Sequence, residues 1–110
     1  MELAKKEGTT MTQRLAFHEV KERNIQTLQQ YIPIVAKVHG GAHPEFHEVR
    51  KVFDTIQKKI SEAGTKKPDL TAEFQTLQKL TGHYAVPKDV CESFETVYLL
   101  LAELDSAYQA

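Results

Sequence analysis

The chain has 110 residues, of which 41% are hydrophobic and 26% charged, with few prolines and glycines. This composition predicts one folded globular domain and excludes a disordered or collagen-like chain. Lysine and arginine total 14 against 15 aspartates and glutamates, so no strong electrostatic field favours nucleic acid or an anionic membrane as a partner.

The cysteine content and the hydropathy of the chain indicate its compartment. Cys91 is the single cysteine, which excludes an internal disulfide and favours a reducing environment. The opening residues MELAKKEGTT contain no apolar signal core, and no stretch approaches the roughly 20 apolar residues that span a bilayer. We therefore expect a cytoplasmic protein that does not insert into membranes.

The first predicted helix covers residues 11–38. Residues 1–8 are charged and lack periodicity, so we expect a flexible arm there, followed by a single domain over residues 9–110. Pro33 lacks a backbone donor, which predicts a kink or a break near Tyr31. Apolar residues recur along this helix at helical spacing, at Leu15, Val20, Ile25, Leu28, Ile32, Val35 and Val38.

Three further helices are predicted from apolar periodicity and from the glycines and prolines that separate them. They span residues 44–62, 69–81 and 88–109, and Asp69 is expected to cap the second of these three. Because short connections join antiparallel neighbours, the sequence predicts an all-α fold, built as an up-down antiparallel four-helix bundle. The side chains expected in its core are Phe46, Val49, Phe53, Ile56, Ile60, Leu70, Phe74, Leu77, Leu80, Val90, Phe94, Tyr98, Leu101 and Leu104.

Histidines are the main candidates for chemistry. His39, His43 and His47 follow one another at four-residue steps around the first interhelical corner, with Glu45 and Glu48 beside them. One interpretation is a transition-metal site at this corner. The other makes His39 a favourable residue at a helix C-terminus, His43 a helix cap and His47 a solvated surface group.

Other motifs for catalysis are missing from the sequence. The chain has no phosphate-binding glycine loop, no serine nucleophile elbow, no C-x-x-C pair and no H-E-x-x-H. We therefore expect no enzymatic activity. Cys91 is expected to pack in the core, although a thiol in the first turn of a helix can be reactive.

The last helix carries more apolar surface than a bundle core needs. Its segment VYLLLAEL, residues 97–104, is apolar on more than one face. Leu99 and Leu100 are the surplus, and they predict self-association or a protein partner through this helix.

Two segments resemble the hemerythrin-like domains of the bacterial di-iron proteins that repair iron–sulfur clusters. KVHGGAHPEF, residues 37–46, resembles the signature K-V-x-x-V-H-G-x-x-H-P-E-L at the first interhelical corner. LQKLTGHYAVPKDVCESFETVYLLLAELD, residues 77–105, resembles the run L-T-x-x-Y-x-x-P-x-x-A-C that leads into the last helix. With the spacing from His18 to His39, the resemblance covers nearly the whole chain after its first residues and implies a four-helix bundle.

The resemblance also implies which metal ligands are missing. In such domains two irons are held by a histidine of the first helix, an H-x-x-x-E pair near the end of the second, a histidine early in the third and an H-x-x-x-E pair late in the fourth. His18 matches the first of these. The other histidines would fall near Ala63, near Lys67 and just beyond Ala110. The resemblance thus implies a degenerate metal end on which His18 alone remains.

Two functional hypotheses follow. The first is a metal-free hemerythrin-like module, without a cofactor, that acts through interaction or regulation. The alternative is an iron-binding stress-response protein of iron–sulfur cluster repair, whose site is completed by oligomerisation around His18 or by the histidine corner. Since His18 and His39 are 21 residues apart, roughly 30 Å along a helix, a site using both needs a bent helix or a second subunit.

Overall fold

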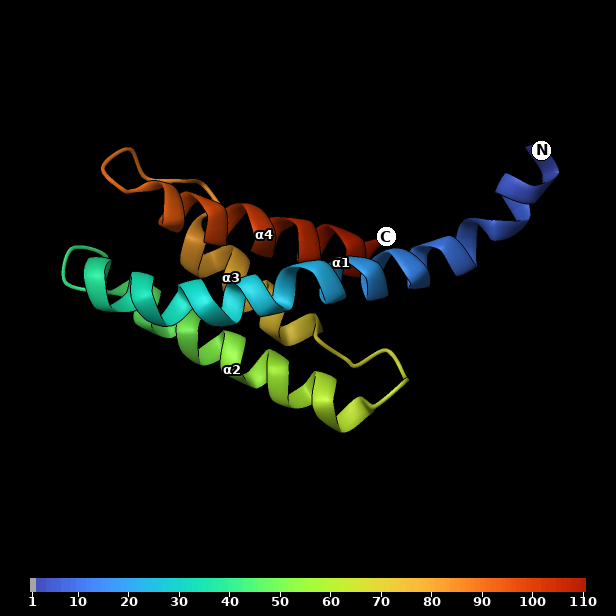
Figure 1. Ribbon diagram of the computed structural model, residues 1–110, viewed down its shortest axis with the longest axis horizontal. Helices are drawn as coiled ribbons and strands as arrows, with labels where there is room; N and C mark the ends of the chain where they lie inside the picture. Colours follow the sequence, from blue (N-terminus) through green and yellow to red (C-terminus); the bar gives the residue numbers. More distant parts are fainter. Residues whose placement is uncertain (1) are drawn as a thin grey trace.

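The computed structural model of the protein describes residues 2–110, and the side chains of residues 17–110. It contains four α-helices, α1 (Glu2–His39), α2 (Glu45–Ala63), α3 (Thr71–Thr81) and α4 (Glu92–Gln109) (Figure 1). No strand occurs in these residues, so the predicted all-α class is confirmed. Over the part of the chain that is described, none of the helices combines the length and the apolar character needed to cross a membrane.

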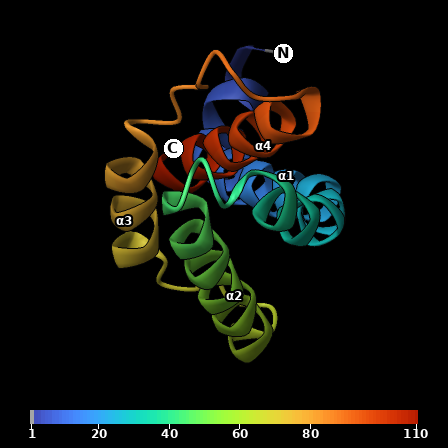
Figure 2. The same ribbon diagram turned by 90° about the vertical axis from the view of Figure 1, so that its left-hand side faces the viewer.

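The helices are arranged as two packed pairs. α1 and α4 lie side by side and run in opposite directions (Figure 1), while α2 packs against α3 and also contacts α1. In the end-on view, α2 and α3 are inclined to the α1–α4 pair (Figure 2). As a result the C-terminal end of α1 meets the start of α4, and the C-terminal end of α4 lies beside Phe17.

One hydrophobic core fills the space between the four helices. It contains three aromatic rings in contact, with 5.1 Å between the ring centroids of Phe46 and Phe94 and 4.8 Å between those of Phe94 and Tyr98. Such aromatic pairs add to the stabilisation that burial of their area provides. The fully buried apolar side chains include most of those predicted, namely Leu28, Ile32, Phe46, Val49, Ile56, Leu70, Phe74, Leu77, Phe94, Leu101 and Leu104.

Val38 departs from the predicted core, because its side chain is 66% exposed. Val35 is buried, and a step of three residues in an α-helix turns the next side chain about 60° away from the first. Val38 therefore lies on the flank of α1 rather than on its buried face.

The ends of α1 also differ from the prediction. α1 begins at Glu2 instead of Met11, since residues 2–10 contain no proline and mostly good helix formers. The flexibility of residues 1–8 stays a prediction, and Met1 lies outside the described residues. The helix continues through Pro33 without a break, because the buried neighbours of Pro33 hold the helix against the core.

The connection between α3 and α4 is longer than predicted, so α4 begins at Glu92 instead of Lys88. Gly82, His83 and Tyr84 all have positive φ angles, of 60°, 60° and 65°. The two non-glycine residues are strained in this conformation. The Tyr84 N–H donates a 2.7 Å hydrogen bond to Thr81 Oγ1, which compensates for part of the strain.

A buried carboxylate joins this connection to both neighbouring helices. Asp105 is 4% exposed and accepts hydrogen bonds from Tyr84 Oη at 2.7 Å, Gln78 Nε2 at 2.9 Å and Gln109 Nε2 at 3.1 Å. A buried carboxylate is tolerated when its oxygens are satisfied in this way. Asp105 therefore fixes the path of the chain between α3 and α4.

Replacing the shortest of these contacts tests that role. Tyr84→Phe removes one donor from Asp105, so we predict a loss of about 2 kcal/mol in the free energy of unfolding, the scale of a hydrogen bond to a charged group. Urea denaturation followed by circular dichroism measures it. Tyr31→Phe, which changes a half-buried tyrosine outside this network, is the matched control; equal losses in the two variants would contradict the role of Asp105.

A pH dependence follows from Tyr98. Burial, together with the Glu45 carboxylate, raises the pKa of Tyr98 from its usual 10.0 to about 12. A group whose pKa is raised on folding contributes stability that is complete below its unfolded pKa and is lost as the pH rises through its folded pKa. We predict that the free energy of unfolding falls by on the order of 1–2 kcal/mol between about pH 10 and pH 12.

Urea denaturation across this pH range checks the prediction. Burial and Asp105 also raise the pKa of Tyr84, so the test compares Tyr84→Phe with the Tyr84→Phe/Tyr98→Phe double variant. The double variant should lose less stability over the same range. An identical slope in both would show that Tyr98 does not carry the effect.

Candidate functional site

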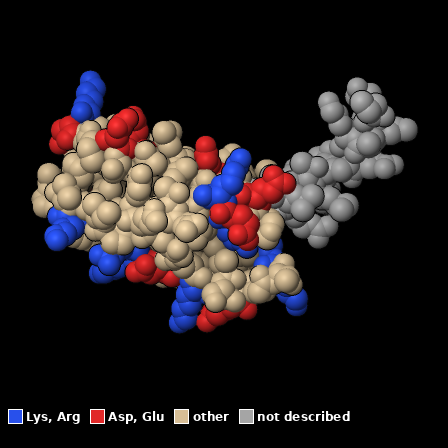
Figure 3. Space-filling model, viewed as in Figure 1, with Lys and Arg blue, Asp and Glu red and all other residues tan. Residues whose placement is uncertain are grey.

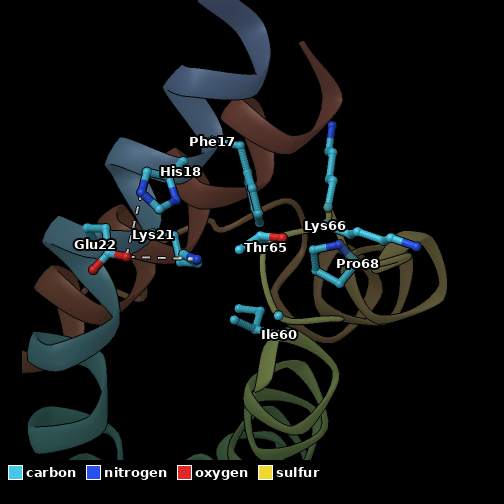
Figure 4. A pocket seen from close by; sticks show the side chains of 10 residues that line it. Phe17, His18, Lys21, Glu22, Ile60, Thr65, Lys66 and Pro68 are labelled. Atoms are coloured by element: carbon cyan, nitrogen blue, oxygen red, sulfur yellow. Dashed lines mark ion pairs between the residues drawn. The ribbon is translucent and has the colours of Figure 1, made fainter. Parts of the chain in front are cut away.

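A pocket lies at the end of the molecule where His18 was expected to mark a metal site. It has a volume of about 320 Å³ and is formed by the early part of α1, the end of α2 and the loop over residues 64–68 (Figure 4). Phe17, Ile60 and Pro68 are its apolar side chains. We call it the His18-end pocket.

The polar side chains of the His18-end pocket are mainly basic. Lys21 extends between α1 and the loop (Figure 4), and its side chain is only 18% exposed. Its ammonium lies 3.9 Å from Glu22 Oε1, an oxygen that is also 3.8 Å from His18 Nε2. Lys66 and Lys67 line the pocket as well. The lining residues therefore include three lysines and one histidine but a single carboxylate.

Lys67 joins the loop before α3 to the C-terminal end of α4. Its Nζ donates a 2.9 Å hydrogen bond to the Tyr108 carbonyl and lies 4.5 Å from the centroid of the Tyr108 ring and 5.7 Å from that of Phe17. A lysine at a helix C-terminus satisfies a free carbonyl and opposes the negative end of the helix dipole. The Tyr108 hydroxyl accepts a 2.9 Å hydrogen bond from the Leu70 N–H, which ties the start of α3 to the same place.

These residues do not fit a di-iron centre. Such a centre needs several imidazole and carboxylate ligands that converge on the metals, whereas the positions at which the resemblance expects histidines hold Ala63 and Lys67. Within the described side chains, no three histidines, cysteines, aspartates or glutamates are close enough together to hold a metal ion. Lysine ammonium groups repel a metal cation, so the pocket disfavours it on charge as well.

At the opposite end, the three histidines of the first corner have different partners and do not converge. His43 Nε2 lies 3.2 Å from Asp89 Oδ1 and His43 Nδ1 lies 3.3 Å from Glu45 Oε2. The His47 ring lies so close to Gly40 that a Cβ at that position would clash with it. His43 makes no side-chain cap of α2; instead it links the α1–α2 corner to the loop before α4.

His39 contacts the single thiol of the protein. Its Nε2 lies 3.1 Å from Cys91 Sγ, and its ring stands edge-on to Phe94 with 5.5 Å between the centroids. Cys91 is exposed, so the expectation that it packs in the core is wrong. The reason is the late start of α4, which leaves Cys91 in an extended conformation at φ −85° and ψ 173°, outside the first turn.

The apolar surplus of α4 is divided between the surface and the core. Leu99 is 56% exposed, as predicted, whereas Leu100 is half-buried and packs against the core. Two side chains of α1, Ile34 and Val38, are exposed to a similar extent, at 57% and 66%. We call Ile34, Val38 and Leu99, with the helix surfaces around them, the α1–α4 apolar surface.

The remaining pocket residues were not predicted from the sequence. Lys21 and Lys66 belong to segments far apart in the chain, and neither is part of a short motif. The one local feature that could have indicated a site is the pair Lys66–Lys67 before Pro68. Such a pair is also common in solvated loops.

No protein-family model, curated protein or solved structure matches this chain. The resemblance to hemerythrin-like domains therefore stands on the two sequence segments alone.

The exposure of Cys91 and its contact with His39 give a direct prediction. In native buffer, dithiodipyridine should modify one thiol per chain without denaturant, because Cys91 is exposed and is the single cysteine. His39→Gln should slow this reaction several-fold, since an amide cannot take the thiol proton that the imidazole is placed to accept.

The release of thiopyridone, followed by absorbance, measures the rate. His47→Gln is the matched control, because it makes the same substitution at a neighbouring histidine and should leave the rate unchanged. A thiol that reacts only in urea would contradict the exposed position of Cys91.

Proposed function

We propose that this protein is a non-enzymatic hemerythrin-like helical bundle of up-down topology, without a di-iron centre, that acts as an interaction module by pairing with a second copy of itself. The single observation that carries the proposal is the α1–α4 apolar surface. Three large apolar side chains are exposed on two helices that lie side by side. Ile34 and Val38 are one turn apart on the same face of α1, and exposed apolar residues gathered on one face are typical of an interaction site.

Charged side chains are sparse over much of the face that Figure 3 shows, which supports a protein partner rather than a solvated face. In the space-filling view, charged side chains lie mostly around the edges of the surface formed by α1 and α4 (Figure 3). A helix pair whose outer face contacts only water usually carries charged residues on that face. An uncharged centre with a polar rim is the usual anatomy of an interface.

The charges at the rim favour a second copy. Lys37 is exposed near the C-terminal end of α1, and Glu92 and Glu95 are exposed at the start of α4. A twofold axis parallel to the two helices would place α1 of each copy over α4 of the other. Lys37 of each copy would then face the acidic start of α4 in the other copy, which favours pairing.

The donor set at the His18 end supports a function without metal. Iron-dependent cluster repair needs ligands that the described residues do not supply, since the pocket presents lysines to any metal ion. Among the residues that line the His18-end pocket, no nucleophile is paired with a neighbouring base, a pair that most enzymatic chemistry needs.

Light scattering coupled to size-exclusion chromatography tests the proposal. The unmodified chain should have the mass of a dimer at high micromolar concentration, and Leu99→Glu combined with Ile34→Glu should give a monomer, because burying two carboxylates in an apolar interface is unfavourable. We expect the apparent dissociation constant to rise at least about a hundredfold.

Gln75→Glu combined with Ala72→Glu adds the same charge to exposed positions of α3 and should leave the dimer intact. Circular dichroism confirms that each variant is folded. A wild-type chain that stays monomeric at every concentration would contradict the proposal, and a dimer that survives the Ile34 and Leu99 changes would move the interface to another surface.

A further inference from the structure

We propose that the His18-end pocket binds a small organic anion, a carboxylic acid with an apolar body, whose carboxylate pairs with the Lys21 ammonium. This proposal does not depend on self-association, because the pocket and the α1–α4 apolar surface share no residue.

The state of Lys21 is the first argument. Most of its side chain is withdrawn from water, since only 18% is exposed, yet its ion pair with Glu22 is long at 3.9 Å. Glu22 is itself 63% exposed and shares the same oxygen with His18. A lysine side chain with so little exposure gains from an anionic partner closer than 3.9 Å, because a closer charge compensates better for the lost hydration. A carboxylate in the pocket supplies that partner at close range.

The sum of charges in the pocket is the second argument. Lys21, Lys66 and Lys67 contribute three ammonium groups against the single Glu22 carboxylate. Lys67 is engaged with the Tyr108 carbonyl and with two rings, but its charge still adds to the local potential. Like charges lining one concave surface raise the local concentration of ligands of opposite sign.

The apolar wall selects among anions. Figure 4 shows Phe17, Ile60 and Pro68 around the space that Lys21 enters. Phe17 is 4% exposed, so its ring forms part of the wall while it is fixed against Tyr108 at 5.5 Å. An inorganic anion would leave this wall in contact with water, whereas an aliphatic or aromatic acid would cover it.

The size of the cavity agrees with a ligand of this class. A volume of about 320 Å³ lies at the lower end of the range of small-molecule sites, which run from roughly 300 to 1,000 Å³. An apolar wall with a few polar groups that fix the orientation of the ligand is their usual composition. Thr65 also lines the pocket and offers a hydroxyl that can donate to the second carboxylate oxygen.

Three probes separate the contributions of charge and apolar body. Octanoate carries both, octanol has the same body without the charge, and inorganic phosphate has charge without the body. Binding to the full chain is measured by two-dimensional amide NMR titration, which also locates the site. We expect saturable shifts with octanoate at residues 17–22 and 64–68, weaker binding of octanol by at least about tenfold, and no saturation by phosphate at comparable concentration.

Variants of the pocket complete the test. Lys21→Met keeps the length of the side chain and removes the charge, so octanoate binding should weaken by at least about tenfold. Lys66→Gln, at an exposed position that tolerates change, should weaken it a few-fold. Lys51→Met is the matched control, because Lys51 is exposed on α2 and pairs with Glu48; it should leave the affinity unchanged.

Several outcomes would overturn the proposal. These are equal binding of octanol and octanoate, binding of phosphate as tight as that of octanoate, octanoate shifts confined to residues outside the pocket, or an unchanged octanoate affinity in a folded Lys21→Met protein. If that variant does not fold, an unchanged affinity in Lys66→Gln at low salt, together with no effect of added salt on the wild type, would have the same force.

Discussion

The Lys67 ammonium forms the contact on which the His18 end of the protein depends. It binds the Tyr108 carbonyl at the C-terminal end of α4 and packs over the rings of Tyr108 and Phe17. Through these contacts one side chain joins the loop before α3 to the C-terminal end of α4 and to Phe17 within α1. Tyr108 extends the connection through its hydroxyl, which accepts the Leu70 N–H. The end of the molecule is thus held by a cation and two aromatic rings.

This arrangement decides what the end can bind. The resemblance to hemerythrin-like domains expects a histidine near position 67, but the residue there is a lysine whose charge is fixed in place by its own contacts. Lys21 and Lys66 add two more positive charges around the same cavity. A site of this kind repels metal cations and attracts anions, whatever the ancestry of the fold. Fold alone does not determine function.

At the opposite end of the molecule, His39 and His43 of the first corner pack against the start of α4. His39 and His43 pack their rings edge-on against Phe94, with 5.5 and 5.3 Å between centroids, while their nitrogens contact Cys91 and Asp89. Both histidines therefore join the α1–α2 corner to the start of α4. His39 and His43 therefore have a packing role in this chain. The contact between His39 and the Cys91 thiol follows from that packing.

Much of the fold could be predicted from the sequence because apolar spacing and turn residues act locally. The four helices and most of the core follow from the three- and four-residue spacing of residues such as Phe46, Val49 and Phe53. The position of Cys91 could not be predicted, because it depends on the strained φ angles of His83 and Tyr84, neither of which has the side chain that such angles favour. The hydrogen bonds of Asp105 and the basic pocket join distant segments, for which a single sequence contains no local signal.

The claim that the His18 end excludes a metal centre is tested most directly by elemental analysis of untagged protein, purified anaerobically, supplied with Fe(II) and then desalted. We predict iron far below one equivalent per chain, with the same residual content in wild type and in His18→Ala. A stoichiometric di-iron complement that is lost in His18→Ala would contradict the account.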